Sequence, residues 1–151
     1  MQWVEQHVMG KNDPRCEAID QTALLSKNLY NAANYLVRQA FILDHRYIPY
    51  NQLDKLMKRS PDYCALPRKV SQWVLKQLDH DWQAFFAASR TDRENPAVFS
   101  GRPKLPKYKH KTEGRNLLTD TVQAVSQKGL RQGLVQPAEL AIEVPTSQPP
   151  L

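Results

Sequence analysis

The sequence has few cysteines, no long apolar run and no apolar leader. Its two cysteines, Cys16 and Cys64, stand without a nearby histidine cluster, so we expect neither a zinc site nor a disulfide. No apolar run approaches the roughly 20 residues of a membrane helix. Polar residues interrupt the first nine positions, where a signal peptide would need an apolar core. These absences predict a soluble, cytoplasmic protein that does not contact a membrane.

Motifs for catalysis are missing as well. The four histidines are scattered, and no two of them stand at metal-ligand spacing. Asp79 and Asp81 flank His80, but neighbouring residues of a helix point to different faces. The chain has no phosphate loop, dinucleotide fingerprint or nucleophile elbow. We therefore expect no enzyme activity, no catalytic residue, no bound metal and no cofactor.

Residues 13–95 carry the pattern of a helical bundle. Asp13 is a suitable N-cap and Pro14 suits the first helical position. Apolar residues then recur at three- and four-residue steps to about residue 43. Shorter apolar patterns predict two further helices, over about 51–58 and 67–88.

The rest of the chain is typical of strands and loops. Residues 1–12 predict a strand followed by a turn, because bulky side chains precede Gly10. Residues 96–145 begin with a proline-rich basic stretch and continue with short β-type segments. Residues 146–151 look like a tail. The expected strands are 117–125, 130–135 and 140–144.

The positive charge of the chain is concentrated in residues 99–115. The chain has a formal charge of +6, and this stretch holds six cations against Glu113 alone. Pro103 and Pro106 favour an extended backbone, along which the cations and the aromatic Phe99 and Tyr108 alternate. Such a ribbon suits a phosphate backbone, with the aromatic rings available for stacking. A solvated basic loop is the alternative.

Two further groups are open to a functional or a structural interpretation. A polar edge on the first long helix, which includes Asn34 and Arg38, suits hydrogen bonds to nucleic acid or to the next helix, and helix packing is the default. An aromatic set at helical spacing looks like a stacking platform but is expected in the core. That set is Trp73, Trp82, Phe85 and Phe86.

Several blocks of the sequence resemble the N-terminal region of the TnpB family of insertion-sequence proteins, which are related to the type V CRISPR nucleases. The first blocks are KNLYNAANY at 27–35 and RQAF at 38–41. The resemblance continues through LPRKVSQ at 66–72 and DWQAFF at 81–86, and ends in FSGRPKLPKYK at 99–109. The order and spacing of the blocks agree over nearly the whole chain.

The resemblance implies an α+β fold in which a helical recognition bundle is inserted into a small wedge-like β-barrel, either complete or incomplete. Residues 1–12 would be the first barrel strand, 13–95 the inserted bundle and 96–145 the remaining strands. Members of the family use an RNA guide to direct cleavage of target DNA. Their catalytic half is a RuvC-like nuclease with three metal-binding carboxylates and a four-cysteine zinc ribbon, and we expect this chain to lack it.

Two hypotheses follow. In the first, the chain is the nucleic-acid-binding N-terminal fragment of a transposase-associated, RNA-guided endonuclease, with guide RNA or target DNA as its partner and the nuclease half on a separate chain. In the second, it is an inert or protein-interacting helical remnant of a truncated transposable-element gene. The first hypothesis predicts these binding residues: Arg102, Lys104, Lys107, Tyr108, Lys109, Lys111, Arg115, Asn34 and Arg38.

Overall fold

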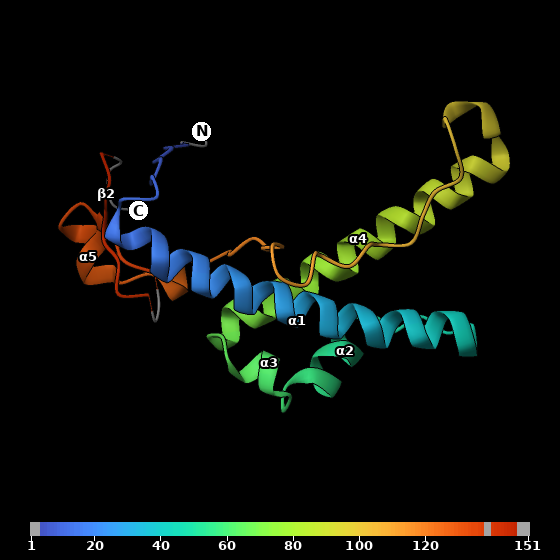
Figure 1. Ribbon diagram of the computed structural model, residues 1–151, viewed down its shortest axis with the longest axis horizontal. Helices are drawn as coiled ribbons and strands as arrows, with labels where there is room; N and C mark the ends of the chain where they lie inside the picture. Colours follow the sequence, from blue (N-terminus) through green and yellow to red (C-terminus); the bar gives the residue numbers. More distant parts are fainter. Residues whose placement is uncertain (1–3, 138–139, 148–151) are drawn as a thin grey trace.

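The computed structural model describes residues 4–137 and 140–147, and within them the protein is mostly helical (Figure 1). Two long helices, α1 (Pro14–Asp44) and α4 (Arg68–Glu94), pack against each other and diverge toward the end of α4. The short helices α2 (Tyr50–Met57) and α3 (Pro61–Cys64) lie on one side of this pair. A single turn of 3₁₀ helix, η1 (Pro96–Val98), follows α4.

Helix α1 begins where the sequence predicts it. The Asp13 carboxylate accepts a hydrogen bond from the Arg15 N–H at 2.9 Å, and Pro14 stands in the first turn. Hydrogen bonds from Arg15 lower the pKa of Asp13 to about 2. The helix ends at His45, whose left-handed conformation (φ of 50°) lets its N–H bond to the Ala40 carbonyl.

The hydrophobic core lies between α1 and α4, with α2 and α3 against it. Helix α1 contributes side chains such as Leu29 and Val37, and α4 contributes Leu75, Leu78 and Trp82, all of them at most 1% exposed. An aromatic cluster extends the core toward the loop after α1, with ring centroids 5.0–6.2 Å apart. Its members are Phe41, Tyr47, Trp82, Phe85 and Phe86. The expectation of a core position is therefore confirmed for Trp82.

The predicted β-barrel is wrong. In the described residues, the only strands are β1 (Leu134–Val135) and β2 (Val144–Pro145), which pair antiparallel as a small open sheet. One isolated bridge joins Val125 and Pro137. A barrel needs strands that close on themselves, and nothing in this part of the chain does so.

The residues expected to form strands have other hydrogen-bond partners. Asn116 and Leu117 bond to α1 instead of to a neighbouring strand. Ser126 caps a short helix, α5 (Gln127–Arg131), by accepting a bond from the Gly129 N–H at 3.1 Å. That helix takes Leu130 out of the predicted second strand. A 3₁₀ turn, η2 (Val122–Ala124), interrupts the predicted first one.

The expected strand at residues 1–12 is also wrong where it is described. Residues 1–3 lie outside the described residues, and 4–10 have no regular structure. The Glu5 carboxylate instead accepts hydrogen bonds from Thr146 and Ser147, so both ends of the described chain meet beside α5 and the small sheet (Figure 1). Residues 148–151 of the expected tail are likewise outside the described residues.

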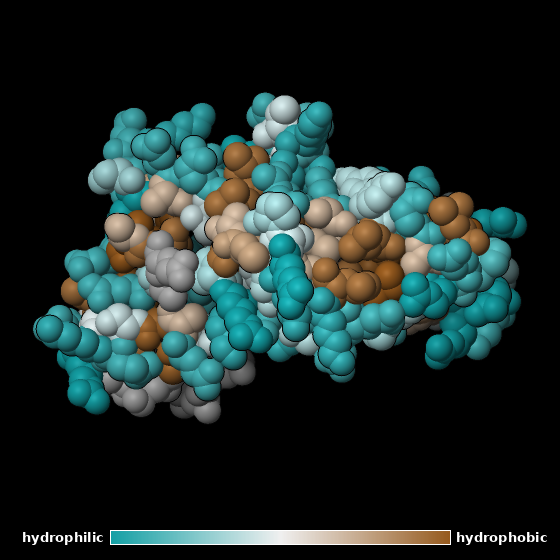
Figure 2. Space-filling model, turned by 90° about the horizontal axis from the view of Figure 1, so that it is seen from below, coloured by the Kyte–Doolittle hydropathy of each residue, from teal (hydrophilic) through white to brown (hydrophobic). Residues whose placement is uncertain are grey.

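On the face seen from below, hydrophobic side chains form separate patches between hydrophilic ones (Figure 2). The exposed apolar residues of α1 include two adjacent pairs that lie seven residues apart and so share one side of the helix. These pairs are Tyr35 with Leu36 and Ile42 with Leu43. None of the helices in the described residues is both long and apolar enough to cross a membrane.

Candidate nucleic-acid interface

The basic stretch forms an extended ribbon, residues 102–110, that runs back from the end of α4 and lies along α1 and α4 (Figure 1). It has no regular secondary structure and forms no strand pairing. Leu105 packs against the hydrophobic core and anchors the middle of the ribbon. The extended path agrees with the expectation from Pro103 and Pro106.

Polar side chains of α1 hold the ribbon by its main chain. Asn31 accepts a hydrogen bond from the Lys109 N–H at 2.8 Å and donates one to the Lys109 carbonyl at 2.9 Å. Asn34 and Arg38 both donate to the Pro106 carbonyl, at 3.1 and 2.8 Å. These side chains follow one another at three- and four-residue steps, so they lie on one face of α1.

The same face of α1 continues to hold the chain beyond the ribbon. Lys27 is only 4% exposed, and its ammonium group donates to the Lys111 carbonyl. Ser26 donates to the Leu117 carbonyl at 2.9 Å, and the Asn116 N–H donates to the Ala23 carbonyl at 3.2 Å. The polar edge predicted on this helix thus holds the ribbon. Its other interpretation, packing against a neighbouring helix, also applies in part, because Asn34 and Tyr30 hydrogen-bond to Trp82 and Asp81 of α4.

Four predicted binding residues extend toward solvent, three from the ribbon and Lys111 from the turn that follows it. Arg102, Lys104, Lys107 and Lys111 are exposed, and no ion pair among the described residues involves them. Lys109 is half-buried, with its ammonium nitrogen 4.9 Å from the centre of the Tyr30 ring. These cations are therefore not neutralised by the described part of the protein.

Tyr108 and Arg38 form a stacked pair beside the ribbon. The Arg38 guanidinium lies 5.1 Å from the centre of the Tyr108 ring, which is 45% exposed. Arg38 is also bonded to the Pro106 carbonyl. The structure brings both predicted residues together and leaves much of the tyrosine ring accessible.

Two predicted binding residues, Asn34 and Arg115, already have side-chain partners within the protein. Asn34 is fully buried, and its side-chain oxygen accepts a hydrogen bond from the Trp82 indole at 3.1 Å. Arg115 makes a two-pronged ion pair with Asp20, at 2.8 and 3.0 Å. The hydrogen bonds of that pair raise the pKa of Arg115 and lower the pKa of the Asp20 carboxyl.

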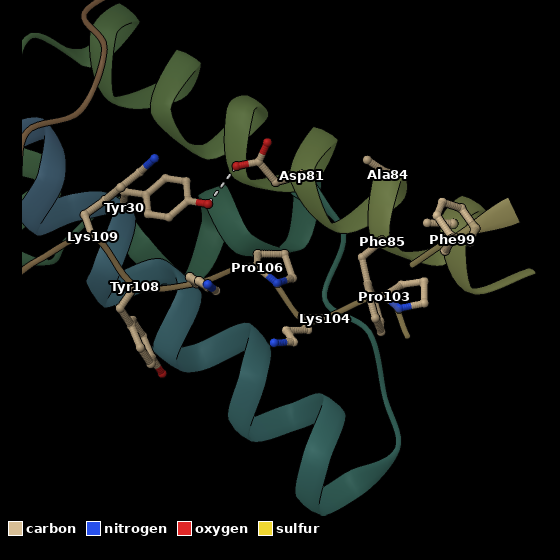
Figure 3. Close-up of a pocket in the computed structure, with 12 residues that line it drawn as sticks. Tyr30, Asp81, Ala84, Phe85, Phe99, Pro103, Lys104, Pro106, Tyr108 and Lys109 are labelled. Atoms are coloured by element: carbon tan, nitrogen blue, oxygen red, sulfur yellow. Dashed lines mark hydrogen bonds between the residues drawn. The ribbon is translucent and has the colours of Figure 1, made fainter. Parts of the chain in front are cut away.

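A cavity of about 530 Å³ opens between α1, α4 and the ribbon (Figure 3). Tyr30 and Asp81 line one end, where the Tyr30 hydroxyl donates to Asp81 at 2.7 Å. Phe85, Phe99 and Pro103 line the other end. Burial, followed by the bond to Asp81, raises the pKa of Tyr30, so its phenol stays protonated and remains a donor.

Trp73 is the residue that the sequence interpretation misplaced. It was expected in the core with the other aromatic residues, but it is 38% exposed, and the Lys76 ammonium lies 4.9 Å from its ring. Trp73, Lys76 and Lys69 line one shallow cavity of about 420 Å³. The signal that could have found this cavity is the spacing of Lys69, Trp73 and Lys76, which at four- and three-residue steps lie on one face of α4.

Comparison with known proteins adds no identity. No family model matches the chain, and no curated protein matches it significantly. The resemblance to the TnpB family therefore stays a prediction. Among residues 4–137 and 140–147, no group of three or more His, Cys, Asp or Glu side chains could hold a metal ion.

Proposed function

We propose that the chain binds nucleic acid through the ribbon, as the nucleic-acid-binding part of a TnpB-like, RNA-guided endonuclease whose cleavage residues lie on a separate nuclease half. One observation carries the proposal. The exposed cations Arg102, Lys104, Lys107 and Lys111 are spaced along a main chain that α1 already holds in place.

The fixed main chain favours binding for an entropic reason. A flexible basic loop loses about 1–2 kcal/mol of conformational freedom per ordered residue when it binds. The ribbon has lost this freedom on folding, because Asn31, Asn34 and Arg38 bond to its backbone. More of the attraction between lysine and phosphate then appears as affinity.

The number of available cations sets the expected salt dependence. Arg115 is paired with Asp20, which leaves Arg102, Lys104, Lys107, Lys109 and Lys111 for phosphates. Each phosphate contact contributes about −0.9 to the logarithmic salt slope on duplex and about −0.7 on single strands. We expect a slope of about −3 to −5.

The test is binding of the protein to a structured RNA and to duplex DNA across a salt series. The variant changes Lys104, Lys107 and Lys111 together to Ala, and the control changes Lys11, Lys128 and Arg131, which are also exposed. Both variants lose the same charge. We expect the ribbon variant to lose at least about tenfold in affinity at low salt and its slope to become shallower by about 2 to 3.

The control triple should lower affinity only slightly and leave the slope nearly unchanged, because long-range attraction is screened by salt. Equal losses in the two variants would mean that net charge alone attracts nucleic acid and that the ribbon is not the site. Absence of binding by the unchanged protein at low salt would refute the proposal.

A further inference from the structure

The cavity beside the ribbon has a composition that bare phosphate binding does not need. Lys104, Lys107 and Lys109 line it, yet an acidic side chain, Asp81, lines it as well, at the end beside Tyr30. A carboxylate repels phosphate, so a site for the backbone alone would be better without it. The combination of a carboxylate acceptor with these cations points to a ligand that carries both hydrogen-bond donors and negative charge.

The wall formed by α4 has a ring and a carboxylate at neighbouring positions. Asp81 and Phe85 are four residues apart in α4 and thus adjacent on its surface. Ala84 and Ala88, with their small side chains, line the space beside them. A flat ring stacked on Phe85 would therefore have its edge within reach of the Asp81 carboxylate.

Asp81 keeps acceptor capacity for a ligand. The Tyr30 hydroxyl bonds to one of its oxygens, Oδ2, and within residues 4–137 and 140–147 no hydrogen bond or ion pair engages the other. Tyr30 holds the side chain in place from α1, as Figure 3 shows. A carboxylate fixed in this way accepts hydrogen bonds and donates none.

We infer that the cavity takes one unstacked nucleobase with an exocyclic amino group, which Asp81 recognises, from a single strand whose phosphates lie along Lys104 and Lys107. This inference rests on the proposed function and deepens it. Carboxylates accept hydrogen bonds from amino groups such as that of cytosine. Thymine and uracil present carbonyl oxygens on both sides of their ring N–H, and these oxygens repel the carboxylate.

A second cavity gives the strand a path out of the first. It has a volume of about 600 Å³ and shares Phe85, Phe99 and Pro103 with the first cavity. Arg102 and Arg93 line it as well. The shared aromatic pair thus stands between two neighbouring spaces, an arrangement that suits successive bases stacked on aromatic rings. Base pairs of a duplex cannot enter such a space without unstacking.

The test compares labelled oligodeoxycytidine and oligothymidine of about 12 nucleotides, a length within the range of known single-strand sites. The two have equal charge and similar ring size, so electrostatics cannot separate them. We expect the cytidine oligomer to bind about fivefold more tightly, and a duplex of the same length to bind less tightly than the cytidine oligomer.

The decisive variant is Asp81→Asn, with Asp79→Asn as its control. Asn at position 81 still accepts the Tyr30 bond through its carbonyl, but its amide can also donate to thymine. Asp79 bonds to Tyr47 and does not line the cavity. We expect D81N to bring the ratio of the two affinities close to one with an unchanged salt slope, and D79N to keep the fivefold preference.

A stacking variant supplies an independent measurement. Phe99 does not belong to the aromatic cluster of the core, so Phe99→Ala should leave the core intact. The substitution should lower the affinity for both oligomers by about tenfold without a change in salt slope. Equal binding of the two oligomers by the unchanged protein, or identical behaviour of D81N and D79N, would overturn the inference and leave the proposed function standing. Failure of every oligomer, RNA and duplex to bind at low salt would overturn both.

Discussion

At the scale of single residues, Asn34 joins the core to the ribbon. Its side-chain oxygen accepts a bond from Trp82, and its amide nitrogen donates to the Pro106 carbonyl. Both bonds are made by a side chain with no exposed surface. An asparagine here is therefore a structural requirement, although its amide suggested a contact with nucleic acid.

We predict that Asn34→Ala strongly destabilises the protein. The change leaves the Trp82 indole N–H without its acceptor, and a buried group left unpaired costs about 1–3 kcal/mol. The Pro106 carbonyl keeps Arg38 as its second donor. Urea denaturation should give a free energy of unfolding lower by about 1–3 kcal/mol. The matched control is Asn28→Ala in the same helix, which should change it by less than about 0.5 kcal/mol. Equal effects of the two changes would contradict the assigned role.

At the scale of elements, α1 acts as the support of a ribbon that is itself irregular. Its inner face packs on α4, and the adjacent polar face binds the backbone of residues 106–117. An extended segment with unpaired backbone N–H and C=O groups can pair with a strand of another chain. Here the helix side chains take the place of a neighbouring strand at Lys109, whose N–H and carbonyl both bond to Asn31.

We predict that Pro106→Gly lowers the stability of the fold and leaves nucleic-acid binding and its salt slope nearly unchanged. Glycine keeps the carbonyl that Asn34 and Arg38 contact, but it gives the unfolded chain more conformations to lose. Urea denaturation should give a free energy of unfolding lower by about 0.4–1 kcal/mol. The control for binding is Pro61→Gly in α3, which should leave affinity unaffected. A clear loss of affinity in P106G alone would mean that the ribbon is not ordered before it binds.

Elements that begin or extend at a local sequence signal could be predicted from the sequence. The distant residues that they contact could not. Asp13 and Pro14 mark the start of α1, and the prolines of residues 102–110 indicate an extended path. The hydrogen-bond partners of Asn31 and Asn34 lie 78 and 72 residues away, beyond any periodic pattern. The strands were wrong because residues with β propensity after position 116 bond to α1 or enter α5, and propensity yields to such contacts.

At the scale of the whole molecule, three phenols tie separate elements together, and two of them are buried. Buried Tyr30 of α1 bonds to Asp81 of α4, and buried Tyr63 of α3 bonds to Asp54 of α2. Tyr47, half-buried in the loop after α1, bonds to Asp79 of α4. Burial is the main cause that raises the pKa of each, followed by the bonded carboxylate. For Tyr63 the pKa rises to about 12.

We predict that the protein loses stability on the alkaline side. A phenol whose pKa is higher in the folded state contributes stability that is complete below its unfolded pKa of about 10 and is lost as the pH rises through the folded value. The free energy of unfolding should therefore fall steadily from about pH 10 to pH 12. Tyr63→Phe should reduce this pH dependence in urea titrations. A flat profile over that range would contradict the burial of these phenols.

Side chains of α1 hold the ribbon by its main chain, so the side chains that the ribbon directs toward solvent can be exchanged for others. Asn31, Asn34 and Arg38 hydrogen-bond to main-chain atoms of residues 106 and 109, and the one side chain of the ribbon that they stack on is Tyr108. They therefore impose no identity on Lys104, Lys107 or Lys111. Natural drift at these positions can change what the surface binds while the scaffold stays intact. The same freedom makes them the first positions to randomise in a display library that seeks a new ligand on this fold.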